Sequence, residues 1–414
     1  MTPTEPLHLF AGYGIELEYM IVHRATLDVL PVTDKILYEI AGAFESEVDL
    51  DSLSWSNELV LHVIELKTNG PAASLDPLAA LFQQHVGKIN EMLLPMDGRL
   101  MPSAMHPWMN PVKETKLWPH EYNPVYQAYD RIFGCTGHGW ANLQSTHINL
   151  PFADDKEFGQ LHTAIRMLMP IMPALTASSP IIERESNGAL DRRLQVYQNN
   201  QKRVPLIIGK VIPEPAVSKN QYIEHIHQRI YSAIAPHDPE GILQYEWLNS
   251  RGAIARFMRN TIEIRVLDIQ ECPAADLAIA KAISTVLHAQ INEQWIDFKH
   301  QLRWETDALA AILHEVIRDA DRTVIDNRQY LQAFAFPERK CVAAELWQHL
   351  LEETLAKQPG DNEAYLAPLS FILQNGTLAR RILAAVDGNF SRKNLAIVYG
   401  KLCECLAEGK QFLG

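Results

Sequence analysis

The stretch Tyr13–Ile21 constrains the fold of this chain more than any other part of its sequence. Its residues alternate in character as they do in a β-strand, where successive side chains point to opposite faces. One face carries Ile15, Leu17, Tyr19 and Ile21, and the other carries Gly14, Glu16 and Glu18. Two neighbouring carboxylates repel each other, and one moves towards protonation unless a cation lies between them. The stretch therefore predicts a strand with one face in a core and a divalent-metal site on the other. The alternative is an ordinary solvated strand face.

Two later segments repeat this pattern. In 144–150, His147 and Asn149 share one face and apolar side chains take the other. In 261–267, Glu263 and Arg265 share a face opposite three β-branched residues. Three such strands predict a sheet with one side on a helical layer and a concave polar side that holds the site.

The segment 59–67 is a further strand candidate, apolar on both faces up to Glu65. Glu58 and Glu65 are seven residues apart, an odd separation that puts them on opposite faces of a regular strand. We therefore expect Glu65 to join the site directly and Glu58 to reach it only from a loop or past a bulge. His62 is expected in the core or behind the site.

Other ranges follow from periodicity and from turn residues. Helices are expected at 33–44, 75–94, 155–177 and 220–235, an irregular loop at 101–123, and a hairpin at 254–258 and 261–267. Beyond Pro273 only helical patterns continue, at 275–297, 307–320, 342–356, 366–374 and 390–408. We expect a catalytic domain over 1–300 and a helical region over 301–414 that packs on it.

The composition excludes several classes of protein. The chain has 414 residues, 47% of them hydrophobic, and a formal net charge of −13. This charge argues against nucleic acid or an anionic membrane as the main partner. No apolar run reaches the roughly 18 residues of a membrane span, and the first ten residues lack a secretion signal. Five cysteines without a C-x-x-C pair are typical of reduced cytosolic thiols. A cytoplasmic, soluble globular protein is expected.

The candidate ligands predict the kind of ion. Carboxylates with at most one imidazole suit Mg²⁺, or Mn²⁺, better than zinc. Such ions usually serve phosphate chemistry, yet the glycine-rich phosphate loops are absent, as are H-E-x-x-H and G-x-S-x-G. Arginines or lysines would then have to hold a phosphate. The candidates are Arg192, Arg193, Arg251, Arg256 and Arg265, each with a structural ion pair as the alternative.

The motifs together resemble the glutamate–cysteine ligase family, which includes bacterial carboxylate–amine ligases. The matching segments are Gly14–Tyr19 (G-x-E-x-E), Glu58 with Glu65, His147–Asn149, Ala174–Pro180, Arg193 before Tyr197, and Thr261–Asp268 (T-x-E-x-R-x-x-D). They follow the family's order over roughly residues 12 to 273. Asn149 departs from the second histidine of many relatives, and Asp191-Arg192 alters the approach to the arginine.

The resemblance implies an α+β, glutamine-synthetase-like fold: a curved, mainly antiparallel sheet that forms an active-site funnel, backed by helices. It also implies that ATP phosphorylates a carboxylate and an amine then displaces phosphate, giving γ-glutamylcysteine or a related γ-glutamyl amide. The substrates would be a glutamate-like acid and a cysteine-like amine. The implied metal ligands are Glu16, Glu18, Glu58, Glu65, His147 and Glu263; Arg193 and Arg265 would be catalytic, and Asn149, Arg192, Arg251 and Arg256 would bind substrate.

Two other functions stay open from the sequence. A metal-dependent phosphotransferase on the same fold would accumulate a phosphorylated product without an amide. A catalytically silent binding protein would keep the sheet without turnover. A homo-oligomer is also open.

Overall fold

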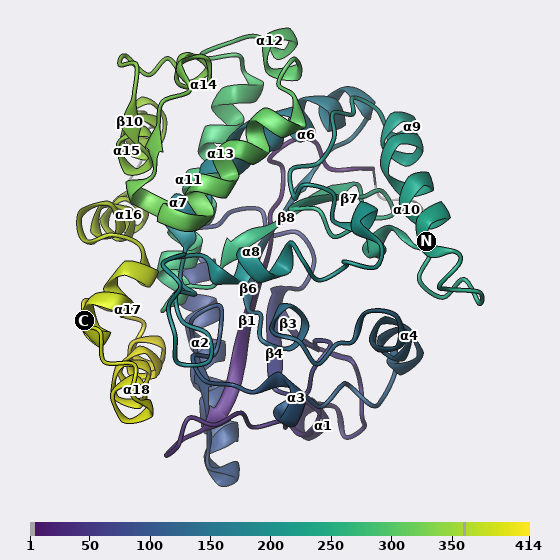
Figure 1. The fold of residues 1–414 in the computed structure, drawn as a ribbon, viewed down its shortest axis with the longest axis vertical. Coiled ribbons are helices and arrows are strands. Elements are labelled where there is room, and N and C mark those ends of the chain that lie inside the picture. Colours follow the sequence, from purple (N-terminus) through teal and green to yellow (C-terminus); the bar gives the residue numbers. More distant parts are fainter. Residues whose placement is uncertain (1–4, 359–361) are drawn as a thin grey trace.

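The computed structural model describes residues 5–358 and 362–414, and its centre is one large antiparallel sheet (Figure 1). The strands lie in the order β2-β3-β4-β1-β6-β8-β7, and β5 pairs with the far end of β1. Their bounds are Gly14–His23 (β1), Glu47–Leu50 (β2), Leu53–Asn57 (β3), Val63–Thr68 (β4), Gly98–Met101 (β5), Ser145–Pro151 (β6), Ala253–Arg256 (β7) and Thr261–Asp268 (β8). The strand predicted from Tyr13–Ile21 is thus at the middle of the sheet.

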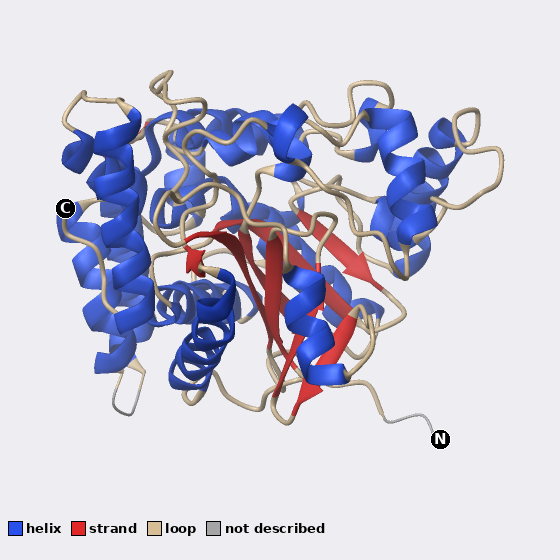
Figure 2. Ribbon diagram, turned by 90° about the horizontal axis from the view of Figure 1, so that it is seen from below, coloured by secondary structure: helices blue, strands red, loops and turns tan. Residues whose placement is uncertain are grey.

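Helices surround this sheet on several sides (Figure 2). In the first part of the chain they are Thr33–Ala41 (α1), Leu78–Leu93 (α2), Pro111–Glu114 (α3), Asn123–Phe133 (α4), His138–Ala141 (α5), Asp155–Leu168 (α6), Pro173–Thr176 (α7), Arg192–Tyr197 (α8), Lys219–Tyr222 (α9) and Gln228–Ile234 (α10). Later come Pro273–Ile291 (α11), Phe298–Leu302 (α12), Thr306–Asp319 (α13), Arg328–Ala333 (α14), Ala343–Glu353 (α15), Glu363–Asn375 (α16), Leu378–Val386 (α17) and Arg392–Glu408 (α18). In Figure 1, α15 to α18 lie along one edge of the molecule, and α4, α9 and α10 lie along the opposite edge.

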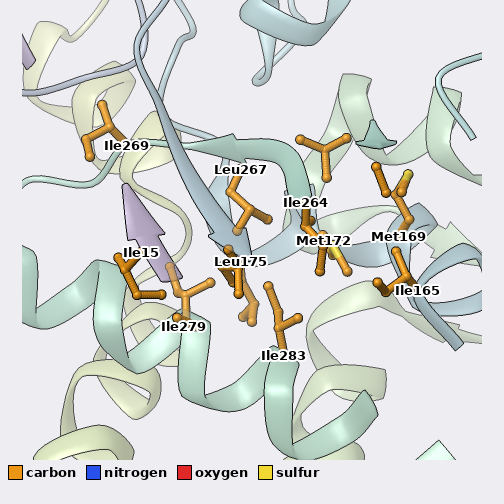
Figure 3. Close-up of a cluster of buried hydrophobic side chains, with 14 of the residues drawn as sticks. Ile15, Ile165, Met169, Met172, Leu175, Ile264, Leu267, Ile269, Ile279 and Ile283 are labelled. Atoms are coloured by element: carbon orange, nitrogen blue, oxygen red, sulfur yellow. The ribbon is translucent and has the colours of Figure 1, made fainter. Parts of the chain in front are cut away.

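The apolar face of β1 packs on the helical layer as predicted. Ile15, Leu17, Tyr19 and Ile21 are all fully buried. Figure 3 shows Ile15 beside Ile279 of α11, while Ile283 lies farther along the same helix, near Leu175 of α7. The α11 helix is buried on nearly all sides, because α2, α6 and α16 also pack against it. The expected antiparallel sheet with helices behind it is therefore confirmed.

The second half of β1 has no polar face. Met20 and Val22 are fully buried in a separate apolar cluster to which α17 and α18 contribute. The carboxylates Glu16 and Glu18 thus occupy the half of β1 that lies between β4 and β6. The C-terminal helices close off the other half and confine the polar face to one region.

Several predicted boundaries were wrong. The strand expected at 59–67 begins only at Val63, and β2, β3 and β5 were not predicted. The helix expected at 155–177 breaks after Leu168, where Pro170 and Pro173 interrupt the backbone hydrogen bonds. Helix α4 was missed, and a short two-stranded pair, Val324–Ile325 (β9) with Cys341–Val342 (β10), follows Pro273.

The hairpin of β7 and β8 is confirmed, although its connection spans 257–260 rather than two residues. The region after residue 300 shares its core with the sheet, since Trp347 and Leu369 belong to the same apolar cluster as Ile15. The division at residue 300 stays a prediction. None of the helices in the described ranges combines the length and apolar character needed to cross a lipid bilayer.

Candidate active site

The strand register brings the predicted acidic residues together on one face of the sheet. Residues directly opposite each other in neighbouring antiparallel strands share a face. Glu18 lies opposite Glu65 of β4, and Glu16 lies opposite His147 of β6. Asn149 of β6 in turn lies opposite Glu263 of β8. Four adjacent strands therefore contribute to a single polar surface.

His147 lies between the two glutamates of β1. Its Nδ1 is 2.7 Å from Glu16 Oε2, and its Nε2 is 3.7 Å from Glu18 Oε1. Burial alone would lower the pKa of this imidazole, but the hydrogen bond to Glu16 and the charges of both glutamates raise it to about 9. The protonated ring thus supplies the cation that two adjacent carboxylates require. Burial would raise the pKa of Glu16, whereas His147 lowers it well below its usual range.

Two small polar groups hold the remaining carboxylates. Ser145 donates to Glu18 Oε2 from its backbone N–H at 2.7 Å and from its hydroxyl at 2.9 Å. Ser56 Oγ donates to Glu65 Oε2 at 2.5 Å. These bonds orient the carboxylates towards the same space. The ligand atoms of Glu18, Glu65 and His147 lie within 4.8 Å of one another.

Glu65 and Glu58 are the carboxyl groups with the least compensation. Burial, followed by repulsion from Glu16, raises the pKa of Glu65 to about 7, although Lys67 lies 3.4 Å from Glu65 Oε2. Burial and the charges of Glu18 and Glu65 raise the pKa of Glu58 well above its usual range. Glu58 follows the last residue of β3, so it reaches the site from a loop, as predicted.

Glu263 differs from the other predicted ligands because two arginines occupy its carboxylate. Arg256 Nη1 lies 2.8 Å from Glu263 Oε2, and Arg265 binds Oε1 through both Nε and Nη2. Burial would raise the pKa of Glu263, but Arg265 and Arg256 lower it. Its ligand atoms also lie within 4.8 Å of those of Glu16 and His147. Glu263 thus connects the acidic surface to a pair of guanidinium groups.

A bulge in β8 places one more carboxylate on the site face. Strict alternation along the strand would have put it on the opposite face. Two steps along β6, from Thr146 to Ile148, correspond to three steps along β8, from Leu267 back to Ile264. The extra residue reverses the alternation, so Asp268 lies opposite Ser145 on the site face. Asp268 accepts from Arg193 Nε at 2.5 Å and so fixes that guanidinium.

Two cavities open on this surface, one on each side of the Glu16–His147 pair. The first has a volume of about 690 Å³, and the predicted site residues along it are Glu18, Glu58, His147, Arg193, Arg256 and Arg265. The second, of about 660 Å³, is lined by Glu16, Asn149, Lys67, Arg259 and the backbone near Gly14 and Gly70. A side chain at position 14 would press on Asn149, since a Cβ there would lie 2.9 Å from Asn149 Cβ. The acidic group thus lies between two spaces, each large enough for a small molecule.

The two remaining predicted residues lie away from both cavities. Arg251 is 2% exposed, and its guanidinium is paired with Glu214 through Nε and Nη2 at 2.5 and 2.7 Å. Arg192 is half-buried and donates to the carbonyl of Glu185 at 2.8 Å. Both guanidinium groups bind other parts of the protein, and neither residue lines a cavity.

Sequence reasoning missed Ser56, Ser145 and Lys67, and it quoted Asp268 only as the last position of a family motif, without a role. Lys67 follows Glu65 by two residues, so strand alternation could have found it. Ser145 likewise precedes His147 by two residues. The bulge that turns Asp268 has no sequence signal of its own.

The donor set fits a hard divalent cation. It consists of carboxylate oxygens with one imidazole, and Glu65 and Glu58 lack full charge compensation. Mg²⁺ and Mn²⁺ prefer such oxygen ligands. His147 can join them only after it gives up its proton.

Comparison with known proteins assigns the family. The model of glutamate–cysteine ligase family 2 matches residues 13–399, nearly the whole chain. The chain belongs to this family. Its members form carbon–nitrogen bonds at the expense of ATP, so the chain is an ATP-dependent ligase.

Two relatives illustrate the spread of the family. An uncharacterized protein of Archaeoglobus fulgidus is 33% identical over 401 residues, which cover 97% of this chain and 100% of that protein. A protein of Nocardioides sp. with the provisional name glutamate–cysteine ligase 2-1 is 26% identical over 313 residues, 72% of each chain.

Solved structures of low identity share the fold. The glutamate–cysteine ligase of Francisella tularensis, crystallised with AMP, superposes with a TM-score of 0.62 at 14% identity, over 95% of this chain and 88% of that one. A bifunctional glutathione synthetase from Pasteurella multocida gives a TM-score of 0.64 at 13% identity over 96% of this chain. The present chain spans only 53% of that enzyme's length. The predicted fold class is thereby confirmed.

Proposed function

We propose that this chain joins the carboxylate of a glutamate-like acid to a primary amine, using ATP and passing through an acyl phosphate. The observation that carries the proposal is the convergence of Glu16, Glu18, Glu65 and His147 from three strands, between two cavities. A cytoplasmic location, suggested by the free cysteines, is part of the same proposal.

Glu16, Glu18, Glu58, Glu65 and His147 would hold Mg²⁺, with Mn²⁺ as a substitute. The bound ion would neutralise phosphate charge and align the transferred phosphoryl group. Glu263 would act mainly through Arg256 and Arg265, because its two oxygens already bind them.

We assign the nucleotide to the second cavity and the acid and amine to the first. Lys67 and the exposed Arg259 give the second cavity its cations for phosphate oxygens. In the first cavity, Arg193 is held in place by Asp268 and Arg265 by Glu263, so both forks are oriented before a substrate binds. Asn149 donates to Glu16 Oε1 at 3.0 Å and would orient that carboxylate rather than bind substrate directly.

The proposed reaction has two steps, phosphoryl transfer and amide formation. A carboxylate oxygen of the acid attacks the γ-phosphorus of ATP, the bond from phosphorus to the bridging oxygen breaks, and ADP leaves. The uncharged amine then attacks the acyl carbon, the bond from that carbon to the phosphate oxygen breaks, and phosphate leaves with an amide as product. One proton of the amine passes to solvent or to a nearby base.

An isotope experiment tests this sequence. The protein is incubated with ATP, Mg²⁺, a panel of amines and glutamate labelled with ¹⁸O in both carboxyl groups. We expect one ¹⁸O atom in the released phosphate, detected by ³¹P NMR, together with an amide of the expected mass. A phosphorylated product without an amide would establish the phosphotransferase instead. No nucleotide turnover with any acid and amine would favour a silent binding protein.

A further inference from the structure

An aromatic surface lines the first cavity. Seven aromatic side chains line it from segments outside the sheet. One is Tyr197 of α8, and we call the other six the aromatic wall: Tyr122, Tyr126, Tyr129, Trp140, Tyr245 and Trp247. They come from α4 and the residue before it, from α5, and from a turn of 3₁₀-helix at Glu246–Leu248 with the residue before that turn. All six are at least partly exposed, and Tyr122 and Tyr245 are 53% and 58% exposed. Such a cluster of large aromatic side chains that stay partly exposed indicates a binding surface.

Four rings of this wall hold one another in place. Tyr129 lies at the centre, with ring centroids 5.3 Å from Trp140 and 5.9 Å from Trp247. Tyr245 stacks on Trp247 at 5.8 Å with an interplanar angle of 10°. A ligand that meets this wall therefore loses little free energy in ordering it.

The backbone at the rim supports the same interpretation. Tyr122 has a φ of +65°, a left-handed conformation that bulky side chains rarely adopt. Such strain is retained where the surrounding structure requires it, often at ligand sites. Here it places a large aromatic ring at the entrance of the cavity, where Tyr122 stays half exposed.

We propose that the amine substrate carries an aromatic or large apolar group, which the aromatic wall binds. This inference rests on the proposed ligase function. A cysteine side chain is too small to cover six aromatic groups, whereas an aryl group would bury much of their exposed area. A pair of aromatic rings also attract each other beyond the effect of the area they bury.

The main competitor for the wall is the adenine of ATP, since bases also stack on aromatic rings. The positions of the cations favour the amine. Arg193 and Arg265 of the first cavity each already bind a carboxylate, whereas the exposed Arg259 lines the second cavity. The phosphate groups of ATP therefore find a more available cation in the second cavity. The test below distinguishes adenine from the amine as the ligand of the wall.

The test compares amines of increasing apolar surface. With ATP, Mg²⁺ and glutamate, we measure kcat/KM for glycine, cysteine, leucine, phenylalanine and 2-phenylethylamine. We expect the aromatic amines to exceed cysteine and glycine by about tenfold or more, as a well-filled apolar pocket allows. A preference for cysteine or glycine would overturn the inference while leaving the ligase function intact. Absence of ADP formation with every amine would instead refute the ligase function.

Variants then assign the effect to the wall. We expect Trp247→Ala to raise KM for the aromatic amine about tenfold and to leave KM for ATP unchanged. Trp247→Phe keeps a ring and should restore most of the affinity. Tyr38→Ala removes an aromatic side chain that is 45% exposed and lines neither cavity, so it is the matched control. A rise in KM for ATP without a rise for the amine would assign the wall to adenine and overturn the inference.

Binding without turnover gives a second measurement. Quenching of tryptophan fluorescence by 2-phenylethylamine should be saturable in the wild-type chain. In Trp247→Phe, the quenched fraction of the variant's own starting fluorescence should be much smaller. The thermal midpoint of each variant without ligand reports whether it is folded. Quenching that is linear and unsaturated in the folded wild-type protein would contradict the proposal.

Discussion

The substitution Glu65→Gln should stabilise the metal-free protein at neutral and alkaline pH while abolishing its activity. Glu65 is 6% exposed, and burial with repulsion from Glu16 raises its pKa from 4.5 to about 7. One pKa unit corresponds to about 1.4 kcal/mol, so ionising this carboxyl group in the folded protein costs on the order of 3 kcal/mol.

The sign of the pH dependence follows from proton binding. Between pH 4.5 and about 7 the folded state holds the Glu65 proton more tightly than the unfolded state does. The free energy of unfolding therefore falls as the pH rises through this window, and the contribution of Glu65 is fully present only below it. Glutamine has no proton to lose, and its carbonyl oxygen can still accept from Ser56.

The assay is urea unfolding of both proteins in EDTA at pH 5 and pH 8. At each pH the free energy of unfolding of the wild type is subtracted from that of the variant. Subtracting the pH 5 value from the pH 8 value then isolates the titration of Glu65 from any change in packing. We expect this pH-dependent part of the stability difference to favour Glu65→Gln by about 2–3 kcal/mol. With Mg²⁺ and an ATP analogue present at pH 8, the wild type should instead be the more stable protein. A difference that does not depend on pH would refute the reasoning.

Three further predictions follow from other contacts. Replacing Arg251 with Met should lower the free energy of unfolding by about 2 kcal/mol in urea, because it removes the buried guanidinium that pairs with the partly buried carboxylate of Glu214, while KM for ATP stays unchanged. Arg193→Lys should keep the fold by circular dichroism but reduce kcat/KM at least tenfold, since a lysine cannot reproduce the guanidinium fork; wild-type activity would contradict the role of Arg193. Binding of Mg²⁺ at pH 7.5 should release protons from Glu65 and His147, seen as a dependence of the calorimetric enthalpy on the buffer. An enthalpy independent of the buffer would show that neither group titrates on binding.

The central part of the fold could be predicted because β1 has a strong two-sided pattern. Alternation of Ile15 and Leu17 with Glu16 and Glu18 specifies which face is buried, and the register follows from that choice. The same reasoning placed His147 on the site face. The neighbouring strand β3, Leu53–Asn57, was missed although Leu53, Ser54, Trp55 and Ser56 alternate between apolar and polar, because this run is short and all five residues of the strand are buried.

Long-range contacts set the limit for the site residues. No sequence pattern distinguishes Arg251 from Arg193. In the structure, Arg251 pairs with Glu214 and Arg193 pairs with Asp268. The partner of Arg193 reaches it only because β8 contains a bulge, and no local pattern predicts that extra residue. The aromatic wall was missed for a similar reason, because segments about 100 residues apart assemble it.

The central claim is that carboxylates from separate strands bind a divalent cation together with a nucleotide. Titration of Mn²⁺ followed by electron paramagnetic resonance, with a non-hydrolysable ATP analogue present, tests this claim most directly. The account predicts saturable binding by the wild-type chain and strongly weakened binding by Glu18→Gln and Glu65→Gln, both still folded. Binding that is absent from the wild-type chain, or equally tight in both variants, would contradict it.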